Sequence, residues 1–294
     1  MTSPLTQLIE AIDPRATLIH HWPLTGGVSA QTTAFEIETP DGERKRFVLR
    51  QHGDRDRARD PDIARHEFQL LTTLHAAGIP VPAPVLVDPA EGIVVEFVEG
   101  DIRTASESPP TDQELIDMAH WLTQIHQLDL ESADLSFLIS IDYQSPDRLE
   151  HRPTDSALVQ EICAVLQRVT PIPTINHPAL LHGDYWRGNL LWGGSRIVSI
   201  IDWEDAMIAD PVIELARARL ELYWIWGAMF CEEFTRQYVA RNAIDLTTLP
   251  HWDLAMALNF ARAVPGWRLP EEREIEMLAK LERFVDRAIE QLPG

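Results

Sequence analysis

The chain has only two cysteines, Cys163 and Cys231, and only two lysines among its 294 residues. Two cysteines are too few for a disulfide framework or a cysteine-based zinc site, which favours a reducing compartment. No uninterrupted apolar run is long enough to span a bilayer, and residues 1–14 lack the basic region and apolar core of a signal peptide. We therefore expect a cytoplasmic protein that does not insert into a membrane.

Positive charge is also scarce, because 25 basic residues stand against 46 acidic ones and give a formal net charge of −21. Nucleic acids and anionic membranes would repel such a chain, so neither is an expected partner. The composition, 45% hydrophobic and 24% charged, is typical of a globular protein, and the length favours one large domain or two lobes. The sequence gives no indication of an oligomeric state.

The first hundred residues are mostly strand-like, with one clear helix. Apolar segments separated by turn residues predict five strands of a largely antiparallel sheet, at residues 16–24, 32–38, 45–51, 83–88 and 92–100. Residues 60–78 have the pattern of a helix, with Asp60 as its cap, Pro61 in its first turn and Gly78 at its end. Together these elements predict a small lobe over residues 1–99.

Residues 100–294 are mostly helical. Apolar residues recur at helical spacing in the segments 111–128, 156–169, 211–241, 252–264 and 270–292. In the first of these segments, Thr111 and Glu114 have the spacing of a capping box. The whole chain is therefore predicted to be an α+β protein, with a strand-rich lobe followed by a mainly helical one.

One strand-like insertion interrupts the helical region. The turn GGSR at 193–196 separates two apolar runs and predicts a β-hairpin. If Trp192 pairs with Ile197, then Asn189 lies opposite Ile200, and Asp202 emerges just beyond, at the same open end of the hairpin. Asp184 would lie in the loop that leads into the first strand.

Three polar residues of this insertion have the pattern that phosphoryl transfer requires. A hydroxyl nucleophile needs an oriented carboxylate, and Mg²⁺ needs hard oxygen ligands while it neutralises a nucleotide triphosphate. Asp184, four residues and then Asn189 reproduce the spacing of a kinase catalytic loop, and Asp202 follows the next hairpin. The alternative, a hairpin with capping Asp residues and a turn Asn, accounts for each residue but poorly for the ordered set. His182 is expected to orient the loop by hydrogen bonding.

The segments LLHGDYWRGNLLW and IIDWEDAMIADPVIELA resemble those of the aminoglycoside phosphotransferase family, a protein-kinase-like family similar to choline kinases and other small-molecule kinases. The resemblance implies Asp184 as the catalytic base and Asn189 and Asp202 as Mg²⁺ ligands. It also implies a two-lobe fold, with residues 1–99 binding nucleotide and residues 100–294 carrying the catalytic loop and the acceptor site.

The small lobe offers candidates for the nucleotide phosphates. Gly26, Gly27 and Ser29 lie between the first two predicted strands, where backbone amides could face phosphate oxygens, although a Gly-Gly pair is more often only a turn. In the third strand Arg50 stands where the family usually has a lysine, and Glu67 is its expected partner. Arginine can bind phosphate in a bidentate manner, although its geometry differs from that of an ammonium.

Other positions complete the hypothesis. Lys45 competes with Arg50 for the phosphate-binding role, and the backbone near Glu96 and Val98 is the expected contact for adenine. Asp210 and Glu214 are expected to give structural support. The acidic residues Glu204, Asp205 and Glu221 would suit an amine-bearing acceptor, and Trp186, Trp203, Trp224 and Trp226 could line its site, although aromatics at helical spacing are more often core residues.

The sequence thus predicts a phosphotransferase that uses Mg²⁺ with ATP, or alternatively GTP. Its partners would be the nucleotide and a small-molecule hydroxyl acceptor, either aminoglycoside-like, an amino alcohol or sugar-like. Two alternatives remain. The first is a nucleotide-binding pseudokinase without turnover, which the arginine at position 50 keeps open. The second is a metal-dependent hydrolase, against which the sequence shows no dense ligand cluster of the kind that a two-metal site needs.

Overall fold

The structure is a computed structural model that describes residues 4–24, 30–103, 108–138, 146–150, 152 and 155–292. The chain forms two compact units, each described here by itself. The first comprises Met1–Ile102, Glu131–Phe137 and Leu190–Glu204, and the second comprises Arg103–Leu130, Leu138–Asn189 and Asp205–Gly294. The division of labour predicted for residues 1–99 and 100–294 stays a prediction.

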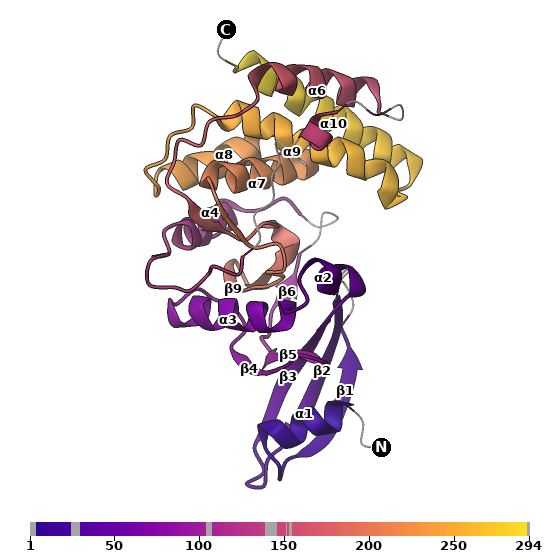
Figure 1. Ribbon diagram of the computed structural model, residues 1–294, viewed down its shortest axis with the longest axis vertical. Coiled ribbons are helices and arrows are strands. Elements are labelled where there is room, and N and C mark those ends of the chain that lie inside the picture. Colours follow the sequence, from indigo (N-terminus) through magenta and orange to yellow (C-terminus); the bar gives the residue numbers. More distant parts are fainter. Residues whose placement is uncertain are drawn as a thin grey trace. The chain divides into compact units, whose positions relative to one another are not determined.

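The first unit is built on the predicted antiparallel sheet (Figure 1). Its strands follow the order β1-β2-β3-β5-β4, and their bounds are Thr17–Pro23 (β1), Ala30–Glu38 (β2), Arg44–His52 (β3), Pro84–Asp88 (β4) and Gly92–Glu96 (β5). The tight turn between β2 and β3 has Gly42 at φ +84°, as expected for a Pro-Asp-Gly turn. The five predicted strands are therefore confirmed.

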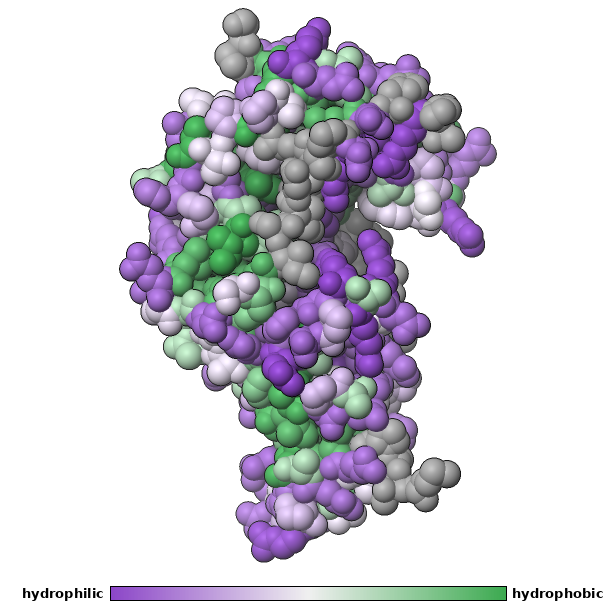
Figure 2. Space-filling view, viewed as in Figure 1, coloured by the Kyte–Doolittle hydropathy of each residue, from purple (hydrophilic) through white to green (hydrophobic). Residues whose placement is uncertain are grey.

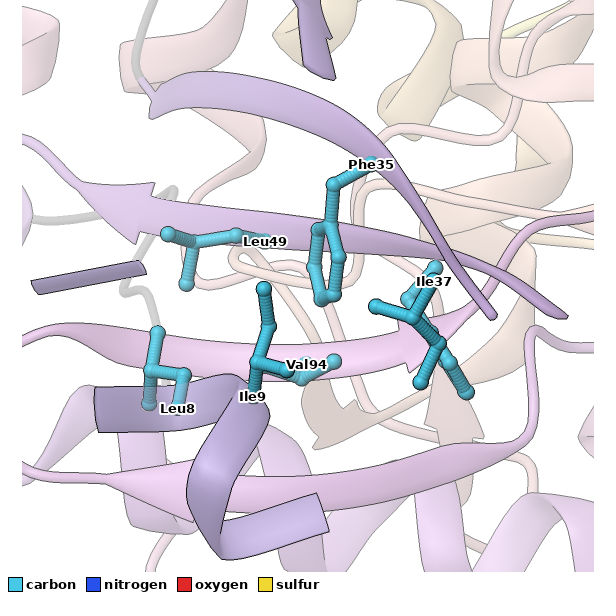
Figure 3. Packing of buried hydrophobic residues seen from close by; sticks show 7 residues of the cluster. Leu8, Ile9, Phe35, Ile37, Leu49 and Val94 are labelled. Carbon is cyan, nitrogen blue, oxygen red and sulfur yellow. The ribbon is translucent and has the colours of Figure 1, made fainter. Parts of the chain in front are cut away.

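One face of this sheet carries the apolar core of the unit (Figure 3). Because successive side chains of a strand point to opposite faces, Phe47 and Leu49 of β3 lie on this face and Arg50 lies on the other. Leu8 and Ile9 pack on the core from helix α1 (Pro4–Ile12), which the sequence analysis did not predict. The sheet thus holds Arg50 on a rigid, well-packed platform.

The predicted helix of the small lobe is α3 (Ile63–Ala76), which contacts β3, β4 and β5. It begins later than expected, because its N-cap is Asp62 and the Asp60 side chain instead accepts hydrogen bonds from the Asp62 amide and the His66 ring. The expectation that Asp60 caps this helix was therefore wrong. A short helix, α2 (Asp54–Arg59), precedes it in a charged stretch that the sequence predicted to be a loop, so that expectation was wrong.

The predicted hairpin is present as β8 (Leu190–Gly193) and β9 (Arg196–Ile200), joined by β6 (Asp101–Ile102) in a three-stranded sheet. Trp192 pairs with Ile197 as predicted, but a register shift follows, and Leu190 rather than Asn189 lies opposite Ile200. The expected pairing of Asn189 was wrong by one residue because Val198 is an extra residue on β9, as in a β-bulge.

The second unit is mainly helical, as predicted. Its helices are α4 (Asp112–His126), α5 (Pro146–Leu149), α6 (Ala157–Val169), α7 (Pro211–Trp226), α8 (Ala228–Val239), α9 (Leu249–Ala263), η2 (Val264–Trp267) and α10 (Glu271–Glu290). The capping box of α4, formed by Thr111 and Glu114, is present. The segment 211–241, predicted as helical throughout, divides at Gly227, whose φ of +101° is incompatible with a continuous helix.

A small two-stranded sheet lies among these helices. It pairs β7 (Ala179–Leu181) with β10 (Met207–Ala209), and the segment after β7 leads through the short helix η1 (Arg187–Asn189) into β8. The sequence analysis predicted neither strand, because each is only three residues long. Their pairing fixes the start of the segment that contains Asp184.

The surface agrees with the composition. Hydrophilic residues cover most of the face seen in Figure 2, and apolar residues form separate patches among them, as a chain with 46 acidic residues would suggest. In the parts of the chain that the structure describes, no helix is both long enough and apolar enough to cross a membrane.

Candidate active site

In the first unit, Arg50 is surrounded by three carboxylates. Its Nε lies 3.3 Å from Oε2 of Glu67 on α3, so the predicted partners do meet. Its Nη2 lies 2.6 Å from Oδ1 of Asp202 and 2.5 Å from Oε2 of Glu204, in the segment that follows β9. Only 16% of the Arg50 side chain is exposed, so these pairs form in a largely dehydrated environment.

Burial and charge act against each other in this cluster. Burial alone would raise the pKa of Glu67, but the Arg50 guanidinium and the hydrogen bond with His52 outweigh it and hold this pKa below its ordinary value. Burial likewise disfavours a charged Arg50, yet the carboxylates of Glu67, Asp202 and Glu204 raise its pKa. Both groups are therefore ionised at neutral pH.

The other nucleotide candidates of the small lobe differ in what the structure shows of them. Gly26, Gly27 and Ser29 lie outside the described residues. Lys45 is 46% exposed and pairs with Glu43 at the start of β3, whereas only 16% of the Arg50 side chain is exposed and it lies among carboxylates. The Glu96 amide donates to the carbonyl of Ala83. The adenine contacts at Glu96 and Val98 stay a prediction.

Asp202 has an unusual backbone conformation. Its φ of +72° lies in the left-handed region, which residues other than glycine rarely adopt and in which Asp and Asn are enriched. The conformation directs its side chain to Arg50, and 28% of that side chain is exposed. Since such strained residues concentrate at functional sites, the conformation is consistent with a role for Asp202 beyond packing.

In the second unit, the Asp184 carboxylate is held from two sides. Its Oδ1 accepts a short hydrogen bond from Nη2 of Arg217 on α7. Its Oδ2 accepts a 2.9 Å hydrogen bond from Nδ2 of Asn189, which also donates to the Asp184 carbonyl at 2.9 Å. One quarter of the Asp184 side chain is exposed. The loop thus presents an oriented carboxylate that still has lone pairs to accept a further proton donor.

The backbone before Asp184 is fixed by a glycine. Gly183 has φ +84°, and a Cβ atom at this position would overlap the carbonyl oxygen of Asp205. The amide of Asp184 donates to Nδ1 of His182 at 3.2 Å, which agrees with the predicted loop-orienting role of His182. Only glycine combines this conformation with such a close approach.

Glu214 supports the loop from α7, and Asp210 caps that helix, which agrees with the structural roles expected for both. The buried carboxylate of Glu214 accepts hydrogen bonds from the amides of His182 (2.9 Å) and Gly183 (2.6 Å) and lies 3.0 Å from Nε2 of His126. Burial alone would raise the pKa of Glu214, but the bond with His126 and the neighbouring histidines lower it. Asp210 caps α7 by accepting from the Val212 amide.

Glu221 lies one helical turn after Arg217 on α7. Burial raises the pKa of Glu221 to about 7, and the negative charge of Asp184 adds to this increase, although Arg217 acts against it. The carboxyl group therefore titrates near neutral pH. The sequence analysis named Glu221 for its charge, together with Glu204, but Glu204 pairs with Arg50 instead.

Trp203 and Trp224 fit the core interpretation, whereas Trp186 and Trp226 are only half-buried. Trp203 and Trp224 are each 2% exposed, and their indole nitrogens donate to the carbonyls of Ile200 and Met277. Trp186 packs against Gly188, and the ring of Trp226 lies 5.1 Å from the guanidinium carbon of Arg187. None of these contacts requires an acceptor molecule.

The chemistry of Asn189 and Asp202 fits Mg²⁺. Because the Asn189 amide nitrogen donates to Asp184, the amide presents its oxygen, a hard ligand, elsewhere. Asp202 offers a partly exposed carboxylate. No group of three or more His, Cys, Asp or Glu side chains within the described residues is arranged to hold a metal. Proteins often hold Mg²⁺ by one or two carboxylates, with waters and phosphate oxygens as the other ligands.

Two residues of these clusters were not predicted to act there. Arg217 was read only as part of an apolar helix, and Glu204 was not expected beside Arg50. The available signal was the spacing of three charged residues in a mostly buried helix, because Glu214, Arg217 and Glu221 follow one another at intervals of three and four. Such spacing places them on one face of α7.

Comparison with known proteins identifies a family to which most of the chain matches. Residues 22–254 match the model of a family described as "Phosphotransferase enzyme family". The chain is 25% identical over 234 residues to acyl-CoA dehydrogenase family member 11 of Rattus norvegicus. That match covers 66% of this chain and 29% of the rat protein, so the chain spans less than a third of the length of this relative.

Solved structures share the fold. A GDP complex of aminoglycoside 2'-phosphotransferase-IIIa has a TM-score of 0.68 at 18% identity, with 96% of this chain and 98% of that chain covered. Amicoumacin kinase hAmiN, in complex with AMP-PNP, Ca²⁺ and Ami, has a TM-score of 0.62 at 15% identity, with 97% and 94% covered. The predicted kinase-like α+β fold is thereby confirmed.

Proposed function

The chain belongs to the phosphotransferase enzyme family, and from this membership we propose that it transfers the γ-phosphoryl group of ATP, or alternatively GTP, to a hydroxyl group of a small molecule. The observation that carries the proposal is the Asp184 carboxylate, oriented by hydrogen bonds to both of its oxygens in a loop that keeps it partly exposed. The proposed acceptor is an aminoglycoside-like compound, an amino alcohol or a sugar-like compound.

In this proposal Asp184 is the catalytic base. Its carboxylate accepts a hydrogen bond from the acceptor hydroxyl, aligns the oxygen with the phosphorus and takes the proton as the new P–O bond forms. The bond between the γ-phosphorus and the bridging oxygen breaks, and the nucleoside diphosphate leaves. Because little covalent chemistry falls to the protein, most of the rate enhancement comes from alignment and charge stabilisation.

The remaining residues bind the nucleotide. Arg50 is proposed to contact the phosphates, with Glu67 fixing its position, and Gly26, Gly27 and Ser29 to cover them. Asn189 and Asp202 would hold Mg²⁺, which when bound neutralises phosphate charge. The GDP and the AMP-PNP with Ca²⁺ in the two similar structures support a nucleotide and a divalent cation as partners.

A screen of acceptors tests the proposal. The protein would be incubated with γ-labelled ATP or GTP, Mg²⁺ and aminoglycosides, amino alcohols or sugars, and labelled products and free phosphate would be quantified separately. We expect a phosphorylated product with at least one acceptor. Tight nucleotide binding without transfer to any acceptor would instead indicate a pseudokinase, and release of phosphate to water alone would indicate a hydrolase.

A further inference from the structure

Three of the four charged residues of helix α7 form a polar stripe, and the fourth, Arg219, pairs with Asp253 on α9. Glu214, Arg217 and Glu221 lie at positions i, i+3 and i+7, so they share one face. Most other residues of the helix are buried, including Leu215, Leu220 and Leu222, which lie elsewhere on its circumference. A charged stripe in such a helix needs a partner of matching polarity.

This stripe contacts the loop from His182 to Asp184. Glu214 binds the amides of His182 and Gly183, and Arg217, almost one turn later, binds the side chain of Asp184. The helix therefore fixes the loop backbone at one point and its functional carboxylate at the next.

Arg217 is itself held in place. Its guanidinium carbon lies 5.7 Å from the centre of the Phe260 ring on α9, within the range of a cation–π interaction. Phe260 is 6% exposed and packs edge-to-face on Trp224, with ring centres 5.2 Å apart. Because this aromatic wall belongs to the core, the guanidinium has little freedom to move away from Asp184.

We propose that Arg217 is a positioning residue for phosphoryl transfer, which fixes the plane of the Asp184 carboxylate so that a lone pair faces the acceptor hydroxyl. This inference rests on the proposed function of Asp184. Asn189 restrains one oxygen by a neutral hydrogen bond, and Arg217 restrains the other by a charge-assisted one, the stronger kind. Together the two bonds remove the rotation that either one alone would permit.

Two other roles for Arg217 make different predictions. A cover that blocks Asp184 until an acceptor arrives would, when removed, increase the transfer of phosphate to water. A direct contact with the acceptor would, when removed, raise KM and leave kcat nearly unchanged. A positioning residue lowers kcat while leaving KM and nucleotide affinity nearly unchanged, because a small misalignment of reacting groups is costly only in the reaction itself.

The experiment compares Arg217→Gln, Arg217→Lys, Asp184→Asn and the double variant Asp184→Asn/Arg217→Gln, with kcat and KM for an identified acceptor, phosphate release to water and ATP affinity as readouts. Arg236→Gln is the matched control, since Arg236 forms an exposed ion pair with Glu233 on α8. We expect Arg217→Gln to lower kcat by about 10- to 100-fold, Arg217→Lys to recover part of it, and the control to equal the parent.

The double variant gives the decisive comparison. If Arg217 acts through Asp184, then Arg217→Gln causes no further loss in the Asp184→Asn background. An equal loss in both backgrounds, a rise in KM alone, or faster phosphate release to water would overturn the inference. Parent activity unchanged by Arg217→Gln would overturn this inference alone, whereas a parent that transfers phosphate neither to an acceptor nor to water would overturn the proposed function with it.

Discussion

Nη2 of Arg50 and Oδ1 of Asp202, 152 residues apart in the chain, are joined by a hydrogen bond of 2.6 Å. The proposed phosphate-binding cation and a proposed metal ligand therefore lie side by side in the first unit. The same guanidinium also meets Glu67 and Glu204, so three carboxylates share one cation. A bound nucleotide and its metal would change this balance, and the first two predictions follow from it.

Arg50→Ala is expected to weaken nucleotide binding and to destabilise the fold. Glu67, whose side chain is only 4% exposed, would keep its hydrogen bond with His52 but lose the Arg50 guanidinium, and removal of one partner of a buried ion pair costs about 3–5 kcal/mol. Arg50→Lys should retain part of both properties because the cation remains. Calorimetric titration with ATP and thermal unfolding would measure these effects.

Lys45→Ala is the matched control for this comparison, because Lys45 lies in the same strand but is exposed. It should bind nucleotide and unfold as the parent does. If Lys45→Ala weakened binding while folded Arg50→Ala did not, the phosphate-binding role would pass from Arg50 to Lys45.

Asp202→Asn is expected to remove the dependence of nucleotide binding on Mg²⁺. Asparagine also tolerates the left-handed backbone conformation at φ +72°, so the change removes the charge without straining the turn. Loss of a residue that hydrogen-bonds to a metal ligand commonly costs 10- to 100-fold in metal affinity, so loss of a ligand should cost at least about tenfold. Calorimetry with ATP, with and without Mg²⁺, measures the coupling; undiminished coupling in the folded variant would remove Asp202 from this role.

Gly183→Ala is expected to distort the loop and to lower both stability and transfer activity. The added methyl group would meet the carbonyl of Asp205, in addition to the strain of a left-handed alanine. Gly42→Ala separates the two effects, because Gly42 has the same φ of +84° but open space around it. Gly42→Ala should lower the free energy of unfolding only by the strain of a left-handed alanine, about 1–2 kcal/mol. Chemical unfolding of both variants tests this, and equal losses would mean that the contact with Asp205 contributes nothing.

Glu221 makes stability depend on pH near neutrality. Its pKa in the folded protein is about 7, against an ordinary value of 4.5. As pH rises from 4.5 to 7, the unfolded chain ionises first, so the parent loses stability across this range. Glu221→Gln cannot ionise, and its unfolding temperature relative to the parent should therefore rise between pH 5 and pH 8. A difference that stays constant with pH would show that Glu221 has an ordinary pKa.

Local sequence patterns predicted the elements of the fold well and their details less well. The five strands of the small lobe and the capping box at Thr111 were predicted because hydrophobic periodicity and capping chemistry are local. The start of α3 was misplaced because the Asp60 side chain binds the Asp62 amide and the His66 ring, and the helix begins only after Asp62. Similarly, a bulge at Val198 displaced Asn189 from its expected pairing, since a single extra residue carries no signature in the sequence.

The candidate site was predictable where spacing carries the chemistry. The order and spacing of Asp184, Asn189 and Glu214 can be recognised in the sequence. In the structure Asn189 donates to Asp184, and Glu214 accepts from the amide of the preceding residue, Gly183. Arg217 was not predicted, because its role depends on the packing of α7 against that loop, whereas its spacing from Glu214 and Glu221 indicates only that the three residues share a helix face. Long-range pairings of this kind become visible only when the tertiary structure is known.

The central claim is that Asp184 is the base for transfer to a hydroxyl group, and Asp184→Asn tests it most directly. Asparagine keeps the size of the side chain and one oxygen that can accept from Arg217, but it removes the negative charge that would take the proton. Product formation by parent and variant should be compared with an identified acceptor, saturating ATP and Mg²⁺, with thermal unfolding and ATP affinity as controls. We predict a loss of at least about a hundredfold in transfer with fold and nucleotide binding retained. Equal turnover of parent and variant would contradict the assignment.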